Sequence, residues 1–166
     1  MANSAIFGQL CQRTMKASVS CIVLRRLLLA GTLVLALSQW VWAPVLVAGN
    51  SMRPTLCPGS IMGLNKLAYR FGRPRRGDIV AICTGRELIV KRILGLPGEE
   101  VRADGGVFYI NGRPLAEPYV LFKDSDNIAP GRLGTNRFVV AGDNRQGTLI
   151  GVVSLDRIVG RLTALR

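Results

Sequence analysis

The chain contains a serine and a lysine that could act together as a nucleophile and its base. It has no histidine, which excludes a Ser-His-Asp triad, a Cys-His dyad and any histidine-ligated metal site. A nucleophile must then take Lys, Asp, Glu, Tyr or a thiolate as its base. Ser51 is the candidate nucleophile, and it comes just after the only long apolar run. If Ser51 is only a turn residue, the chain is an anchored β-domain of unknown purpose.

Lys91 is the candidate base. It lies in an apolar segment and, by strand alternation, shares a face with Ile89 and Ile93. An apolar environment disfavours the charged amine and lowers its pKa, so that a neutral lysine can accept a serine proton. Arg92 points to the other face and cannot act as a base, because a guanidinium stays charged. Taken alone, the segment is equally compatible with a surface lysine that protects a strand edge from aggregation.

The residues from Gly49 onward are expected to form an all-β domain. Short apolar segments alternate with Gly- and Pro-containing turns, and Asn111-Gly112 is typical of a type I′ hairpin turn. The predicted fold is therefore mainly β, an antiparallel β-sheet domain arranged as a barrel or sandwich after one N-terminal membrane helix. Residues 123–136 are expected to form a loop. The expected strands and hairpin cover residues 60–65, 78–82, 87–95, 106–115, 137–141 and 158–165.

The apolar run at residues 27–48 is predicted to be a transmembrane helix. It has 22 residues and no charge, which suits a hydrocarbon core of roughly 30 Å. Residues 1–26 are basic and contain no acid, so the positive-inside rule places them in the cytoplasm or the mitochondrial matrix. Residues 49–166, the candidate catalytic domain that contains Ser51 and Lys91, are then expected on the trans side. A cleaved signal or a mitochondrial targeting segment is the alternative.

The net charge indicates an anionic partner. The chain has 22 basic and 10 acidic residues, a formal net charge of +12. Acidic lipid headgroups are the expected partner, because a membrane anchor is also predicted. Nucleic acid is not expected, since the basic residues do not alternate with aromatic residues and no zinc-finger spacing occurs.

The cysteines indicate neither a metal site nor a redox motif. Cys11, Cys21, Cys57 and Cys83 form no CxxC pair, and we expect no metal and no cofactor. A disulfide between Cys57 and Cys83 is compatible with an oxidising compartment. Two buried free thiols are the preferred interpretation.

Five ordered motifs resemble those of the type I signal peptidases, or leader peptidases, including the mitochondrial inner-membrane and conjugative pilus-processing enzymes. The first resembles the serine box of that family, the third its lysine box and the fourth its G-D-N box. Together with the apolar run, the resemblance covers residues 27–165. The motifs are residues 49–56 (GNSMRPTL), 76–80 (RGDIV), 90–99 (VKRILGLPGE), 142–145 (GDNR) and 157–161 (RIVGR).

The resemblance assigns roles to particular residues. Ser51 matches the nucleophile and Lys91 the general base, and the Ser51 backbone N–H matches an oxyanion-hole donor. Some members carry a serine two residues before the nucleophile as a second donor, where this chain has Gly49. Met52 is expected to line the substrate cleft, with ordinary core packing as the alternative.

The fourth motif departs from the family pattern. Thr148 stands where the family has the hydroxyl that orients the lysine, and the D-S-R that usually follows is absent, with Ile150 at the position of the acid. Asp143 is interpreted first as a turn-forming residue that pairs with an arginine, and is the nearest polar support for the site.

The resemblance implies a membrane-anchored endopeptidase that removes signal peptides from exported preproteins with a Ser/Lys dyad. Its substrates would carry small residues one and three positions before the cut. It would lie in the inner (cytoplasmic) membrane of a cell or, alternatively, in the mitochondrial inner membrane. Other hypotheses are a catalytically weakened or specialised relative and an anchored basic β-domain that binds lipids or partners. No pattern in the chain indicates its oligomeric state.

Overall fold

The computed structural model describes residues 23–34, 36, 41–85, 87–121, 127–146 and 150–164. The chain divides into two units, Met1–Trp40 and Val41–Arg166. In the first unit, residues 23–34 and 36 are helical and carry exposed apolar side chains such as Leu27 and Leu33. Among the described residues, no helix has both the length and the apolar character needed to cross a bilayer.

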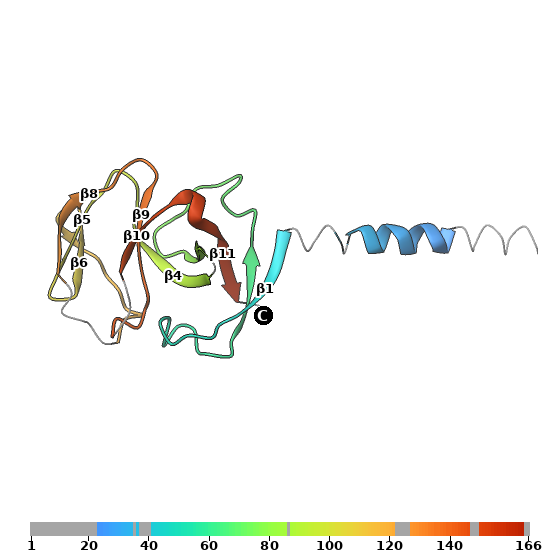
Figure 1. Cartoon of the computed structure of the whole chain (residues 1–166), viewed down its shortest axis with the longest axis horizontal. Helices are drawn as coiled ribbons and strands as arrows, with labels where there is room; N and C mark the ends of the chain where they lie inside the picture. The colour runs from blue at the N-terminus through green and yellow to red at the C-terminus, as the bar shows by residue number, and fades with distance from the viewer. Residues whose placement is uncertain are drawn as a thin grey trace, which may run out of the picture. The chain divides into compact units, whose positions relative to one another are not determined.

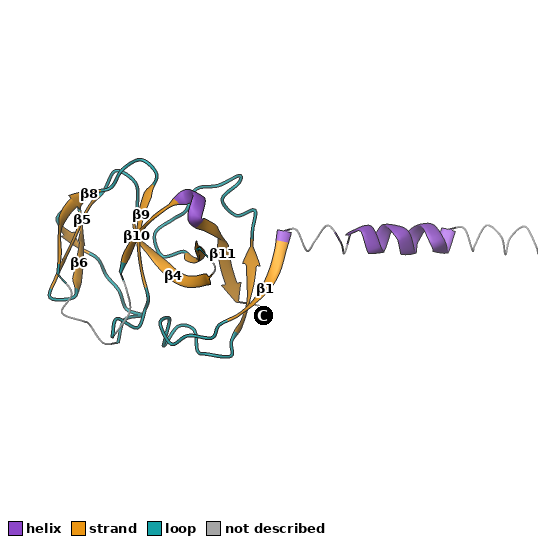
Figure 2. Ribbon diagram, in the orientation of Figure 1, coloured by secondary structure: helices purple, strands orange, loops and turns teal. Residues whose placement is uncertain are grey.

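The described residues of the second unit form two antiparallel sheets joined by turns (Figure 2). One short 3₁₀ helix, η1 (Leu155–Arg157), precedes the strand that is farthest along the chain. The strands are β1 (Trp42–Leu46), β2 (Ile61–Asn65), β3 (Ile79–Thr84), β4 (Glu87–Gly95), β5 (Glu100–Asp104), β6 (Val107–Ile110), β7 (Arg113–Pro114), β8 (Ile128–Arg132), β9 (Arg137–Ala141), β10 (Gly151–Ser154) and β11 (Ile158–Ala164).

The larger sheet has the strand order β1-β2-β11-β3-β4-β9-β10, and the smaller sheet has the order β7-β6-β5-β8. Figure 1 shows β5, β6 and β8 of the smaller sheet close together. Within the larger sheet β11 lies between β2 and β3, pairing Leu162 with Leu64 on one side and Arg161 with Val80 on the other. In this sheet β11 therefore lies between the β1–β2 pair and the β3–β4 pair and is hydrogen-bonded to both.

Strand β4 is buried on both faces toward its C-terminal end. Ile93 packs in a cluster with Val80 and Phe138, whereas the next residue, Leu94, packs in a cluster with Phe108 of the smaller sheet. Because alternate side chains point to opposite faces, a strand covered on both sides is a nearly continuous apolar run. This explains why the segment around Lys91 is so apolar.

The sequence located several elements correctly. The expected strands at residues 87–95 and 137–141 coincide with β4 and β9. The predicted hairpin turn is confirmed, since Asn111 and Gly112 have φ values of 49° and 79°, as a type I′ turn requires. The mainly β, antiparallel character of the domain is confirmed as well.

Two regions differ from the expectation, both at sheet edges. Residues 42–46, predicted to continue the helix, form β1, and residues 128–132, predicted to be loop, form β8. Each strand contains a proline. Pro44 in β1 is typical of a helix end, and Pro130 in β8 is typical of a loop. Both β1 and β8 are edge strands, where a missing backbone N–H costs no ladder hydrogen bond.

Candidate functional site

Ser51 lies in a loop that core residues hold at both ends. The loop closes where Val47 N donates to Ser60 O at 2.9 Å and Gly59 N donates to Val47 O at 2.8 Å. Met52, which is 1% exposed, is buried in the same core cluster as Val47. A buried residue next to a half-exposed serine fixes the backbone while the hydroxyl stays near the surface.

Lys91 lies in the middle of β4, opposite the fully buried Val80 of β3. Its side chain has no acidic partner among the described residues, and Lys91 is only 8% exposed. Burial lowers the pKa of the Lys91 amine below its ordinary value, because the charged form loses hydration without a compensating charge. The predicted desolvation of this lysine is therefore confirmed.

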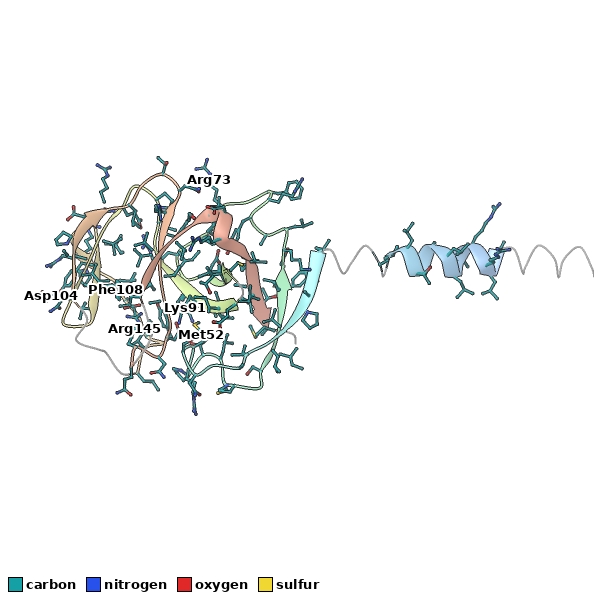
Figure 3. The ribbon with its side chains drawn as sticks, viewed as in Figure 1. Met52, Arg73, Lys91, Asp104, Phe108 and Arg145 are labelled. Carbon is teal, nitrogen blue, oxygen red and sulfur yellow. The ribbon has the colours of Figure 1, made fainter. Side chains whose placement is uncertain are left out.

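Ser51 and Lys91 line one pocket of about 200 Å³. Its walls are residues 45–49, Ser51 and Met52 on one side and residues 88–91 on the other. Figure 3 shows Lys91 and Met52 at this part of the larger sheet. The serine loop and the lysine strand, separated by about forty residues in sequence, thus meet at a single surface opening.

The pocket lies between two strand edges that have free backbone groups. Strand β4 pairs with β9 only from Arg92 onward, so residues 88–91 have no ladder partner on that side among the described strands. Strand β1 is the edge of its sheet. Antiparallel pairing through β2, β11 and β3 makes β1 and β4 run in the same direction. The arrangement can accept an extended peptide between the two edges.

The site presents a hydroxyl, an amine that is readily deprotonated and a free backbone donor. The structure gives no hydrogen bond between Ser51 Oγ and Lys91 Nζ, and apo sites often tighten only when substrate binds. The Ser51 N–H has no hydrogen bond to another described residue, so it can serve a ligand. A buried amine beside a hydroxyl is suited to proton abstraction, and a backbone N–H to stabilising an oxyanion.

Arg92, the neighbour of Lys91, connects several segments through one guanidinium. Its Nε donates to Asp143 Oδ1 at 2.8 Å and its Nη2 to Asp143 Oδ2 at 2.6 Å. Its Nη1 donates to Gly77 O at 3.0 Å, and Nη2 also reaches Thr55 Oγ1 at 3.4 Å. Burial alone would lower the pKa of Arg92, but the hydrogen bonds to Asp143 and its charge outweigh this and raise it. The predicted arginine pairing of Asp143 is therefore confirmed.

Asn144 attaches the same loop to the serine. Its backbone N donates to Ser51 O at 3.0 Å, and its Nδ2 donates to Asn50 O at 3.3 Å. Because Asp143 is fixed by Arg92 on the lysine strand, the loop at residues 142–145 relates the serine loop to the strand that carries Lys91.

A second ion pair connects this loop to the segment that follows β7. Arg145 pairs with Glu117, donates through Nε to Gly142 O at 2.8 Å, and stacks over the Phe108 ring (Figure 3). The Tyr119 hydroxyl donates to Glu117 Oε1 at 3.0 Å. The Arg92 guanidinium lies over the Tyr119 ring, with Cζ 4.0 Å from the ring centroid. Burial and the Glu117 charge raise the pKa of Tyr119, so its phenol remains a donor.

The other predicted residues have different outcomes. Met52 packs in the core and also lines the pocket of Ser51 and Lys91, while its contact with a substrate stays a prediction. Thr148 lies outside the described residues. Cys57 and Cys83 are free thiols as preferred, but they are exposed rather than buried. The contacts of Arg92 with several segments and the part played by Glu117 have no local pattern in the sequence that could predict them.

A larger cavity of about 660 Å³ lies elsewhere in the second unit. It is lined by Arg73, Pro97, Phe138 and neighbouring residues. Thr135 supplies the one hydroxyl group of this lining, and the lining contains no lysine and no carboxylate that could act as a base for it. The chemistry-bearing residues therefore indicate the smaller pocket as the functional site.

The chain is similar in sequence to several known proteins. A family model described as "Signal peptidase, peptidase S26" matches residues 20–165. Signal peptidase I T of Bacillus subtilis is 33% identical over 153 residues, which cover 82% of this chain and 79% of the relative. Signal peptidase I of Leptolyngbya laminosa is 33% identical over 147 residues, covering 80% and 72%. A solved signal peptidase I from Enterococcus faecalis matches with a TM-score of 0.47 and 28% identity, over 55% of this chain and 98% of that one.

The buried pair between Arg92 and Asp143 predicts a large effect on stability. Replacing Asp143 with Ala leaves a guanidinium that is 11% exposed without its partner, so we expect a loss of about 3–5 kcal/mol in the free energy of unfolding. The measurement is urea denaturation of the full chain in detergent. Asp104→Ala is the matched control, because Asp104 is 67% exposed and pairs with Arg102 at 3.9 Å. That control should lose about 1 kcal/mol or less. Equal losses would contradict the importance of the buried pair.

Proposed function

The chain belongs to the signal peptidase family, peptidase S26, and on that premise we propose that it is a membrane-anchored serine endopeptidase that removes signal peptides from exported preproteins. The observation that carries the proposal is the single pocket lined by a half-exposed Ser51 and a desolvated Lys91. The absence of histidine from the sequence leaves this lysine as the base best placed for the serine.

The proposed reaction begins with proton transfer. Neutral Lys91 Nζ takes the proton of Ser51 Oγ while Oγ attacks the carbonyl carbon of the scissile peptide bond. The Ser51 N–H stabilises the resulting oxyanion. The Lys91 ammonium then gives its proton to the leaving amine, the C–N bond breaks, and an ester to Ser51 remains. Lys91 next takes a proton from water, whose oxygen attacks the ester and releases the signal peptide as a carboxylic acid, with the proton returning to Ser51.

The substrate is proposed to bind as an added strand between β1 and β4. The residues before the cut lie along residues 45–48 and 88–91, parallel to both strands, and use their free backbone groups. A pocket of about 200 Å³ that several substrate residues share favours small side chains, which fits small residues one and three positions before the cut. Met52 forms an apolar wall of this pocket.

Asp143 acts in this scheme as a positioning residue. It touches neither Ser51 nor Lys91 directly, but it fixes Arg92, the neighbour of the base, and its own neighbour Asn144 holds the carbonyl of Ser51. Thr148 is proposed to orient the amine of Lys91 as the family's hydroxyl does.

The membrane is the proposed site of action, either the cytoplasmic membrane of a cell or the mitochondrial inner membrane. The helical residues 23–34 expose large apolar side chains, including Leu24, Leu28 and Val34, which suits an anchor in lipid. The net charge of +12 suits anionic headgroups at its surface. The second unit is proposed to lie on the trans side, where exported preproteins arrive.

Removal of either reacting group tests the dyad. Ser51→Ala and Lys91→Arg should each reduce cleavage of a preprotein with an A-x-A site to background, because one lacks the nucleophile and the other carries a side chain that stays charged. The assay is conversion of labelled preprotein to mature protein by the purified full chain. Lys66→Arg serves as a control for lysine replacement. Substantial cleavage by Ser51→Ala would reject the serine mechanism.

The lowered pKa of Lys91 predicts a pH dependence. Only the neutral amine accepts the serine proton, and the folded pKa lies below the ordinary lysine value. The rate should therefore rise with pH through that lowered pKa and fall on acidification below it. Single-turnover rates measured across pH provide the test. A rate that is unchanged on acidification would show that no titrating base of this kind participates.

Gly49 offers a way to add an oxyanion donor. A Cβ atom built at Gly49 meets no atom within 4 Å, and Gly49 lines the same pocket as Ser51. Gly49→Ser should therefore fold normally and raise kcat about tenfold or more, since single donors are worth about 10²-fold in other hydrolases. Gly49→Ala is the matched control and should give no gain. An equal effect of Ser and Ala would show that the hydroxyl does not reach the oxyanion.

A further inference from the structure

A second pocket, of about 310 Å³, adjoins the serine loop and shares no lining residue with the pocket that contains Lys91. Arg53 and Pro54 follow Ser51 and Met52 directly in the chain, and they form one wall of it. Asn144, which bonds the carbonyl of Ser51, belongs to the opposite wall. The pocket is thus connected to the serine through two independent segments. Its lining consists of Arg53, Pro54, Leu121, Asp143, Asn144 and Gln146.

The pocket carries an uncompensated positive charge. Its one acidic residue, Asp143, is buried and bound bidentately by Arg92, so its charge is already neutralised. Arg53 is exposed and has no ion pair with another described residue. Gln146 is also exposed, and its side-chain amide is free to donate a hydrogen bond. The pocket therefore offers donors and positive charge to a ligand that carries a carboxylate.

The direction of the strands places this pocket after the cut. Strands β1 and β4 both run toward the Ser51–Lys91 end of the first pocket, as residues 45–49 lead to Ser51 and residues 88–90 lead to Lys91. A peptide parallel to both has its residues before the cut along these strands. Its next residues then leave past Ser51, toward Arg53 and Asn144.

We propose that this second pocket binds the first residues of the mature protein and that Arg53 makes the enzyme prefer an acidic side chain there. The inference rests on the proposed function and adds a selection on the downstream side of the cut. A carboxylate at one of the first three positions would pair with the Arg53 guanidinium and accept from Gln146. A lysine or arginine at the same position meets like charge.

The expected effect is that of an exposed ion pair in an open pocket. Such pairs are individually weak, so exchanging Glu for Lys at the responsive position should change kcat/KM by about threefold to tenfold. The preference should decrease at high salt, because exposed charges are screened. It should not depend on the protonation of Lys91, which affects all substrates alike.

The experiment uses the purified full chain and one preprotein in which Glu, Gln or Lys is placed in turn at each of the three positions after the cut. For the unaltered chain we expect Glu to be cleaved fastest and Lys slowest at one or two of these positions. Arg53→Glu should reverse that order, and Arg53→Gln should abolish the difference. Arg113→Glu, an equal change of charge at an exposed residue of β7, should leave the order as it was.

Several outcomes would overturn the proposal. One is equal cleavage of Glu and Lys substrates by the unaltered chain, a result that does not depend on the folding of any variant. Another is a charge preference that Arg53→Glu and Arg113→Glu alter equally. Failure of the unaltered chain to cleave the Gln substrate at all would instead reject the proposed function itself.

Discussion

The bidentate ion pair between Arg92 and Asp143 is the interaction on which the candidate site depends. The Asp143 side chain is fully buried, and the same guanidinium contacts Gly77 O and Thr55 Oγ1, so one side chain connects four of the five sequence motifs. A buried charge without its partner is costly, which makes these contacts mutually dependent. Four motifs that are far apart in sequence therefore meet at this one cation.

Lys91 and Arg92 are adjacent in sequence and have opposite electrostatic environments. Strand alternation sends Arg92 toward carboxylate and carbonyl acceptors, whereas Lys91 is buried without an acidic partner among the described residues. A carboxylate beside Lys91 would raise its pKa and keep it protonated. These adjacent basic residues therefore differ in pKa: contacts with Asp143 raise that of Arg92, whereas burial lowers that of Lys91.

The sequence predicted the parts of the fold that local patterns determine. Strands β4 and β9 and the Asn111-Gly112 turn follow from apolar runs and turn chemistry, and Ser51 and Lys91 follow from the lack of histidine and the motifs. Edge strands β1 and β8 were missed because proline in an edge strand resembles a break. The contacts of Arg92 with Tyr119 and of Arg145 with Glu117 depend on tertiary packing, which single-sequence patterns do not encode.

The position of β11 has a consequence for how the protein folds. Among the described strands β11 comes last in sequence, yet in the larger sheet it lies between the β1–β2 pair, which flanks the Ser51 loop, and the β3–β4 pair, which carries Lys91. Pairings between residues so distant in sequence form late, because the entropy of closing long loops opposes them. Pairing of these two halves within the larger sheet is therefore complete only once β11, from Ile158 onward, has inserted between them.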